Sequence, residues 1–310
     1  MPNSSDSRGP VQQDHVIKLP RPLDQSQVQS FVDDGFLIVP EVISQPELDE
    51  LKQDTADLAR GKYPCPSLES LSPDTPDEQV LKNILCIHMP HYISPVMRKY
   101  VSHPSICSIL SQITAAHLPH WDGSVKCMQS MLFVKPPGFQ GQAWHQDEIY
   151  IPTRDRSLVG AWIAIDDATI ENGCLWVLPA SHQSGFLYSQ RAHNRPDEFD
   201  LGEESHGFDD SNEVPVEVKA GTLVFFNGYL LHRSRKNRGN LYRRVLVNHY
   251  MNAWSLLPWR CQTKDQHVPA AKADYRCIVP VAGVDPYAWK GLDTDSQGVY
   301  LRTCPANTPE

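Results

Sequence analysis

From Val125 onward the chain consists of short, apolar-rich runs separated by turn-forming residues about every ten positions. The runs read KCMQSMLFV, WHQDEIYI, LVGAWIAIDDA, CLWVLP, GTLVFF and RRVLVNHYM, and segments such as KPPG and ENG stand between them. Evenly spaced short strands with intervening turns are typical of a β-sandwich or a β-barrel. This part of the chain is therefore predicted to form a mainly β body.

The part of the chain before Val125 has a different pattern, with apolar residues at helical spacing. Helices are predicted over residues 24–34, 45–59 and 93–113. A short strand is expected at 36–39, and residues 61–78, which are rich in Pro and Ser, indicate a loop.

A helical part followed by a strand-rich part, without internal repeats, favours one integrated domain over residues 24–310. We expect a helical cap over about 24–120, a β core over about 121–254 and an irregular C-terminal segment over 255–310. Residues 1–23 are predicted to form a flexible arm.

Charge and hydropathy exclude several classes of partner. The net charge of −9 argues against nucleic acid or an anionic membrane surface as the main partner. No run of 18 apolar residues is present, so no membrane span is expected. The N-terminal residues lack the apolar stretch of a secretory signal, and the eight cysteines are dispersed without a Cys-x-x-Cys pair. These features favour reduced thiols in a cytoplasmic protein.

A peroxisomal location is the alternative that the N-terminus raises. Arg8 and His15 have the separation of a peroxisomal N-terminal address, but Gly9 and Val16 replace its usual apolar partners. The cytoplasm is therefore the location that we predict.

Two charged segments stand out in the second half of the chain. Eight of the 17 residues of 197–213 are acidic, and six of the 13 residues of 232–244 are Lys or Arg. The acidic segment is interpreted either as a solvated surface excursion or as a mobile lid over a site. Because the basic segment lacks interleaved aromatic residues, it indicates a loop that handles a small anion rather than nucleic acid.

Two His-x-Asp triplets are candidates for metal ligands, namely His120 with Asp122 and His145 with Asp147. With 13 His and 37 acidic residues in 310, chance alone gives 13 × 37/310, or about one to two, such triplets. Only the surroundings can therefore decide. The first triplet runs into Gly123 and is predicted to lie in a turn, where its side chains would diverge.

The second triplet is predicted to begin a strand, where residues i and i+2 point to the same face and can reach one ion. A catalytic metal site needs a third ligand with open positions beside it. The candidate is His232 in FFNGYLLHRSRKN, at the end of a strand 85 residues beyond Asp147. A barrel can bring such a distant strand alongside the first.

Taken in order, these segments resemble the phytanoyl-CoA dioxygenase family of iron- and 2-oxoglutarate-dependent oxygenases. The resemblance covers about residues 27–254 and rests on MQSMLFVKPPG, WHQD, AWIAIDD, ENGCLWVLPASH, AGTLVFFNGYLLHRS and RRVLVNHYM. It implies a double-stranded β-helix core, which is jelly-roll or cupin-like, with N-terminal helices packed on one side.

The resemblance also implies a set of catalytic residues. His145, Asp147 and His232 match the triad that holds Fe(II) and leaves three positions open for 2-oxoglutarate and O2. Arg243, eleven residues after His232, matches the guanidinium that binds the far carboxylate of 2-oxoglutarate. Ser234 resembles the hydroxyl partner of the same carboxylate. Because related halogenases have a small residue in place of the acid, Asp147 predicts oxygenation.

Further residues match less specific positions of the family. Met131 and Trp162 match positions that line the cosubstrate pocket, although plain barrel core would also explain them. Lys82 resembles a lysine of the helical cap that reaches the cosubstrate. His182 is interpreted as structural or as supporting the site indirectly.

The remaining candidates are interpreted mainly as structural. His249 and Asn248 are assigned to packing, and Arg244 to a solvated strand face. His88 and His91 are assigned to the core or surface of the cap, with a contact to substrate left open.

The implied reaction is oxidation, in the first place hydroxylation, of an unactivated C–H bond in a small molecule, with release of succinate and CO2. Desaturation, ring formation and demethylation stay open. The acidic segment 197–213 disfavours a CoA thioester and favours a small metabolite, for example in natural-product biosynthesis (secondary metabolism).

Two other functions stay open at this point, a cupin-type isomerase or hydrolase and a non-catalytic jelly-roll ligand-binding module. Both are disfavoured by the complete triad with Arg243. The oligomeric state is not fixed by the sequence, and a homodimer stays open.

Overall fold

The computed structural model describes residues 22–63, 65, 71–82, 84–200, 202–256, 278–290 and 299–303. Almost all of the predicted N-terminal arm, including the address-like residues Arg8 and His15, lies outside the described residues. The same is true of most of the predicted C-terminal segment. None of the helices within the described ranges combines the length and apolarity needed to cross a membrane.

Five α-helices, with two strands of the large sheet between them, lie before β3 (Val125–Lys135) within the described residues. They are α1 (Gln25–Asp34), α2 (Gln45–Ala59), α3 (Asp77–Leu81), α4 (Pro95–Val101) and α5 (Pro104–Ile113). Asp24 and Ser44 form capping boxes with residues three positions later, and these fix where α1 and α2 begin. The helix predicted over 93–113 is two helices, because Pro104 cannot continue α4 and instead begins α5.

The strands form two main sheets. The large sheet has the order β1-β10-β5-β12-β3-β2-β14, with β13 also paired to β3, and the small sheet has the order β4-β11-β6-β9. The large sheet comprises β1 (Phe36–Val39), β2 (Ile84–His88), β3 (Val125–Lys135), β5 (Val159–Ala164), β10 (Leu223–Asn227), β12 (Arg243–Asn252), β13 (Val279–Ala282) and β14 (Tyr300–Thr303). The small sheet comprises β4 (Gln142–His145), β6 (Leu175–Val177), β9 (Val214–Val216) and β11 (His232–Ser234).

A separate hairpin and four short 3-10 helices complete the part of the chain that the structure describes. The hairpin pairs β7 (Gln190–Ala192) with β8 (Glu203–Ser205). The 3-10 helices are η1 (Pro90–Tyr92), η2 (Asp147–Ile149), η3 (Ser181–Ser184) and η4 (Ala288–Lys290).

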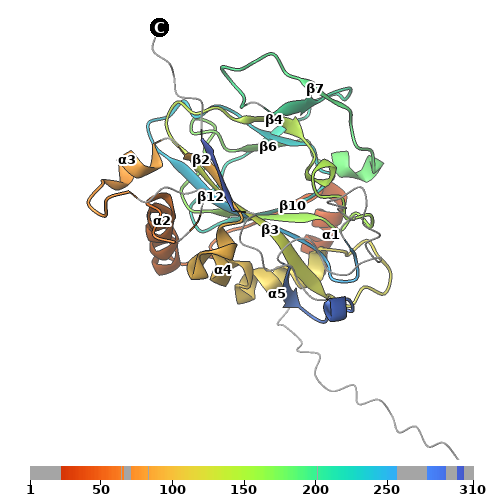
Figure 1. Ribbon diagram of the computed structural model, residues 1–310. Helices are drawn as coiled ribbons and strands as arrows, with labels where there is room; N and C mark the ends of the chain where they lie inside the picture. The colour runs from red at the N-terminus through yellow and green to blue at the C-terminus, as the bar shows by residue number, and fades with distance from the viewer. Residues whose placement is uncertain are drawn as a thin grey trace, which may run out of the picture.

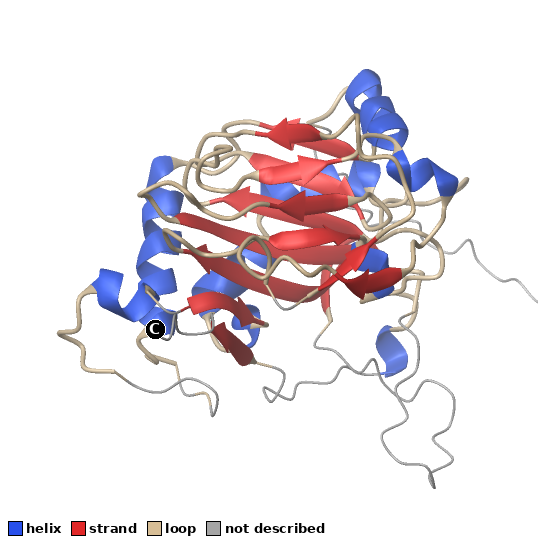
Figure 2. Cartoon of the chain, turned by 90° about the horizontal axis from the view of Figure 1, so that it is seen from above, coloured by secondary structure: helices blue, strands red, loops and turns tan. Residues whose placement is uncertain are grey.

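The large sheet is the middle of three layers. Figure 1 shows α2, α4 and α5 along one side of it and strands β4 and β6 on the other. Seen from above, the strands lie side by side across the centre with helices around them (Figure 2). This arrangement confirms the predicted mainly β, double-stranded β-helix architecture with helices packed on one side.

Strand β12 shows how the sheet separates a core from a site. Leu246 and Tyr250 belong to the cluster that packs against the helices, whereas Val245 and Val247 belong to the cluster between the sheets. Since side chains alternate along a strand, Arg243 lies on the inner face with Val245 and Val247, and Arg244 lies on the opposite face. The adjacent arginines therefore meet different surroundings.

The structure differs from the sequence-based boundaries at both ends. Strand β2 falls within the predicted helical cap but lies between β3 and β14 in the large sheet. The segment 255–310, predicted to be irregular, contains β13 and β14. In particular, Tyr300 of β14 pairs with His88 of β2. Strands of four residues at a sheet edge give too short an alternation to be recognised in the sequence.

Candidate active site

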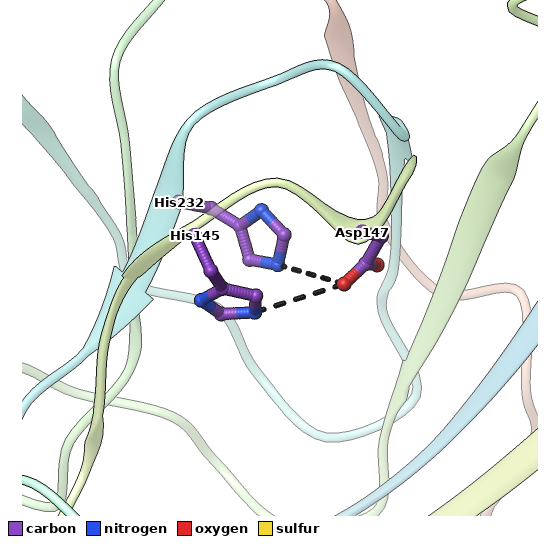
Figure 3. Close-up of side chains that lie close together, drawn as sticks. All are labelled: His145, Asp147 and His232. Carbon is purple, nitrogen blue, oxygen red and sulfur yellow. Dashed lines mark ion pairs between the residues drawn. The ribbon is translucent and has the colours of Figure 1, made fainter. Parts of the chain in front are cut away.

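His145, Asp147 and His232 converge at one point between the sheets. The Nε2 atom of His145 is 3.6 Å, and that of His232 is 3.7 Å, from Oδ1 of Asp147 (Figure 3). Their candidate ligand atoms all lie within 4.8 Å of one another. The convergence depends on strand pairing, because β11 pairs with β4 so that His232 lies directly opposite His145.

Backbone carbonyls orient both imidazole rings. His145 Nδ1 is 2.8 Å from the carbonyl of Ala143, and His232 Nδ1 is 2.9 Å from that of Leu230. A carbonyl can only accept, so each Nδ1 carries the hydrogen and each Nε2 presents a lone pair toward Asp147. Two imidazole nitrogens and one carboxylate oxygen form the donor set that suits non-haem Fe(II).

The predicted strand does not extend to Asp147. Strand β4 ends at His145, and Asp147 begins the 3-10 helix η2. The i, i+2 argument from strand geometry was therefore wrong in its reason, although both side chains do reach one point. The turn of chain after His145 brings Asp147 back toward the two rings, as Figure 3 shows.

His249 supports the carboxylate, a role that the sequence reasoning missed. Its Nε2 lies 2.9 Å from Oδ2 of Asp147, while Oδ1 faces the two ligand histidines. His249 stands on β12 and is buried. Its alternation with Val247 and Arg243, which face the inside of the barrel, could have revealed this position in the sequence.

The electrostatics of the triad keep it ready to bind a cation. Burial, followed by the neighbouring His232, lowers the pKa of His145 to about 3, so the imidazole is neutral at physiological pH. Burial by itself raises the pKa of Asp147, but His232 and His249 outweigh it and hold this pKa below its usual range. Neutral imidazoles and an ionised carboxylate are the forms that bind a metal.

The triad opens into a cavity of about 400 Å³. Its wall includes Arg243, Ser234, Trp162 and Met131. The Arg243 guanidinium lies 5.8 Å from the Trp162 ring centroid. Burial lowers the pKa of Arg243 to about 10, which still leaves it charged at neutral pH. The structure thus brings together seven of the eight site residues named from the sequence.

The eighth residue, Lys82, lies apart from the cavity. It is exposed in the turn after α3 and is not among the residues that line the cavity wall. A buried lysine that the sequence analysis did not single out, Lys135 at the end of β3, lines the cavity beside Ser234 instead. Lysine at the end of a strand is ordinarily exposed to solvent, so no sequence pattern indicated that Lys135 is buried.

Two other residues considered in the sequence, Arg244 and His182, make contacts away from the cavity. Arg244 makes two hydrogen bonds to Asp166, of 2.7 and 2.8 Å, and is half-buried rather than fully solvated. His182 Nε2 bonds the Val32 carbonyl at 2.9 Å and so ties η3 to α1. Both roles are structural.

The two histidines of the cap also have different positions. His91 is buried and bonds Ser130, whereas His88 lines the cavity, where its ring stacks on Tyr300 at 3.9 Å. His88 is thus the one of the two that substrate can reach.

The acidic segment 197–213 and the basic segment 232–244 pair with each other. The ion pairs are Glu213 with Arg233 at 2.5 Å, Glu213 with Arg235 at 2.6 Å and Glu198 with Arg238 at 2.5 Å. Asp200 of the acidic segment also pairs with Arg302 of β14 at 2.6 Å, and both line the cavity. Much of the charge in both runs is therefore neutralised within the fold.

The comparisons with known proteins agree with this geometry. The sequence profile described as Phytanoyl-CoA dioxygenase (PhyH) matches residues 31–245. The chain belongs to the phytanoyl-CoA dioxygenase family. Members of this family are non-haem iron- and 2-oxoglutarate-dependent dioxygenases, and the His-Asp-His triad of this chain is the set of ligands that such enzymes require.

Relatives in the family differ in how much of the chain they match. Phytanoyl-CoA dioxygenase 1 of Oryza sativa subsp. japonica is 32% identical over 177 residues, which cover 56% of this chain and 60% of that protein. Phytanoyl-CoA dioxygenase domain-containing protein 1 of Danio rerio is 26% identical over 295 residues, which cover 80% of this chain and 98% of that protein.

Solved structures share the fold at lower identity. The alpha ketoglutarate dependent carbocyclase SnoK from nogalamycin biosynthesis matches with a TM-score of 0.56 and 22% identity, over 78% of this chain and 88% of that one. EctD from S. alaskensis with bound Fe matches with a TM-score of 0.58 and 20% identity, over 77% and 80%. A further EctD structure contains 2-oxoglutarate and 5-hydroxyectoine. These likenesses establish the fold of this family member.

Proposed function

We propose that this chain binds Fe(II) through His145, Asp147 and His232 and uses 2-oxoglutarate and O2 to hydroxylate an unactivated C–H bond of a small metabolite, with release of succinate and CO2. The observation that carries the proposal is the presence of the triad and the buried cation Arg243 in one cavity. A metal-binding module without a cosubstrate would have no need for that cation in its cavity.

The residues of the chain bind and orient, while bound iron would supply the activation of O2. The two Nε2 lone pairs and Asp147 Oδ1 leave one face of the metal to exogenous ligands. Arg243 and the Ser234 hydroxyl are placed to bind the far carboxylate of 2-oxoglutarate, since a planar guanidinium can donate to both of its oxygens. Trp162 and Met131 line the same cavity and help to keep water out of it.

The substrate is proposed to bind against His88 and Tyr300, whose stacked rings line the cavity together with the Asp200–Arg302 ion pair. A cavity of about 400 Å³ lies within the range of small-molecule sites. This size supports a small metabolite, such as a natural-product intermediate. The acidic segment is weaker support than the sequence suggested, because its carboxylates pair with arginines.

The other functions that the sequence left open find less support. A cupin-type isomerase or hydrolase would have no use for Arg243 beside Ser234, and a non-catalytic module would have no use for a converging triad. A cytoplasmic location remains a prediction, and whether the protein forms a homodimer is likewise open to measurement.

The decisive experiment is anaerobic visible absorption of the Fe(II)-loaded protein, titrated with 2-oxoglutarate. A weak charge-transfer band near ~500 nm is expected when a 2-oxo acid chelates iron at open positions of such a triad. Small metabolites and acyl-CoA thioesters are then added to the saturated complex, and the proposal expects the former to perturb the band. Iron binding without any band would contradict the proposed cosubstrate, and perturbation by acyl-CoA alone would contradict the substrate class.

A further inference from the structure

Lys135 is a buried basic residue in the wall of the cavity. It is the last residue of β3, is 1% exposed, and lines the cavity together with Arg243 and Ser234. Among the ion pairs within the described ranges, none joins Lys135 or Arg243 to a carboxylate. Two basic side chains are thus buried on neighbouring strands, and a positive charge on either is costly unless a ligand offsets it.

The Lys135 ammonium has its three hydrogens directed to three acceptors. Nζ lies 3.2 Å from Ser234 Oγ and 3.4 Å from the Gly173 carbonyl, and it also bonds the Arg235 carbonyl. A Cβ at position 173 would lie 2.6 Å from Nζ, so the observed position of the Lys135 amino group requires glycine at 173. The lysine is therefore held in place by the turn before β6 and by the chain after β11.

These contacts determine which way the Ser234 hydroxyl points. Its Oγ accepts from Lys135 Nζ and, at 3.2 Å, from the backbone N–H of Gln142. A hydroxyl oxygen has two lone pairs and one hydrogen. With both lone pairs engaged by donors, the hydrogen has to be donated elsewhere, and Ser234 lines the cavity.

We propose that Lys135 is a positioning residue for the cosubstrate, which acts through Ser234 so that the hydroxyl donates to the far carboxylate of 2-oxoglutarate. This inference rests on the proposed function, and it assigns selectivity for a dicarboxylate to a residue outside the triad.

The pKa of Lys135 also supports a bound carboxylate in the cavity. Burial, and after it the charge of Arg243, lowers the pKa of Lys135 well below its usual value. A carboxylate bound beside Lys135 would favour its charged form. Lysine and dicarboxylate would therefore stabilise each other in the filled cavity.

The test compares two 2-oxo acids that chelate iron alike. 2-Oxoglutarate has the far carboxylate, and 2-oxobutyrate lacks it. Affinities of the anaerobic Fe(II) protein for both are measured by titration of the absorption band, for the wild type, Lys135→Met, Ser234→Ala and the double variant. Lys135→Met is expected to weaken 2-oxoglutarate binding about tenfold, with 2-oxobutyrate and iron binding unchanged. Equal loss for both acids, or no loss, would overturn the proposal.

The double variant separates action through Ser234 from an independent effect of charge. If Lys135 acts through the hydroxyl, Lys135→Met should add less than about twofold to the loss caused by Ser234→Ala. Multiplied losses would contradict that route. Lys135→Gln keeps a donor for Ser234 without the charge and should retain most of the affinity; it also serves as the second variant if Lys135→Met does not fold.

Lys126 provides a matched control on the same strand. It is also fully buried on β3 but pairs with Asp285 at 3.3 Å and does not line the cavity. Lys126→Met should lower stability and leave the preference between the two acids unchanged. If the wild type gives no band with either acid, the proposed function fails; if the wild type prefers 2-oxoglutarate and Lys135→Met does also, only the role of Lys135 fails.

Discussion

The two His-x-Asp triplets share a histidine and an aspartate at the same spacing, but they lie in opposite surroundings. His120 has a left-handed backbone with φ of 67° and is exposed, and Asp122 accepts from the backbone N–H of Ser124 at 2.9 Å. This triplet closes the turn between α5 and β3. His145 and Asp147 lie between the sheets, where β11 brings His232 alongside. A metal site is thus made by the pairing of distant strands, and the triplet only takes part in it.

The largest expected contrast is between the two aspartates. Asp147→Ala should lower iron-dependent turnover of 2-oxoglutarate by more than about a hundredfold, because it removes a ligand, whereas loss of a supporting residue costs 10- to 100-fold. Asp122→Ala should leave turnover within about twofold and lower stability by about 1 kcal/mol through the lost turn bond. Succinate release and urea unfolding measure the two effects. Loss of turnover in Asp122→Ala alone would reverse the assignment.

Arg243 and Arg244, which are adjacent on β12, give a second comparison between a residue at the site and one away from it. Arg243→Met should raise the 2-oxoglutarate concentration needed for half-maximal turnover about a hundredfold, since it removes a buried partner of a carboxylate. Iron affinity should stay nearly unchanged. Arg244→Met removes the pair with Asp166 on the other face and should change that concentration less than about twofold. An equal loss of iron binding in Arg243→Met would contradict a role toward the cosubstrate.

A smaller effect is expected at His249. Asp122 takes its hydrogen bond from the backbone, but Asp147 takes one from the His249 side chain. His249→Phe should weaken Fe(II) binding about tenfold by leaving Asp147 free to turn. His249→Gln keeps a donor and should restore most of the affinity, as measured by competition with a chelator. A loss that Gln does not restore would indicate packing instead of orientation.

The smallest contrast concerns acid stability of the metal-free protein. The pKa of His145 is about 3, below its ordinary value of 6.5, so between these values the unfolded chain binds a proton that the folded chain does not. Stability is thus full above pH 6.5 and falls as the pH drops toward 3. From pH 6.5 to 5 this residue should account for about 1–2 kcal/mol of the free energy of unfolding.

Two variants test this dependence by urea unfolding at both pH values. His145→Gln should reduce the fall in stability, and His120→Gln, on an exposed turn, should not. The same dependence in wild type and His145→Gln would assign the acid sensitivity to other groups.

Patterns within short stretches were sufficient for much of the fold. Alternation and turn spacing predicted the strands from Val125 onward, and helical spacing of apolar residues predicted the helices near 24–34 and 45–59. The triad was predicted because ordered segments of the chain resembled a family. By contrast, β14 was missed because four residues at an edge, paired with a strand over 200 positions away, leave no local pattern.

Charge was the least predictable property. Glu213 pairs with Arg233 and Arg235 about 20 positions later, and the sequence cannot show that two oppositely charged runs neutralise each other. The environments of the lysines were hidden for a related reason. Lys135 is buried and Lys82 is exposed, and each environment depends on what the other strands bring to it, which no local pattern in the sequence shows.

The position of β14 has a consequence for the way the enzyme is made. All three metal ligands and Arg243 have been synthesised once β12 is complete, but Tyr300 and Arg302, which also line the cavity, come some fifty residues later. At roughly 5–20 residues per second, the ribosome needs several seconds for that interval. During translation the metal ligands are therefore made before the strand that completes the lining of the cavity.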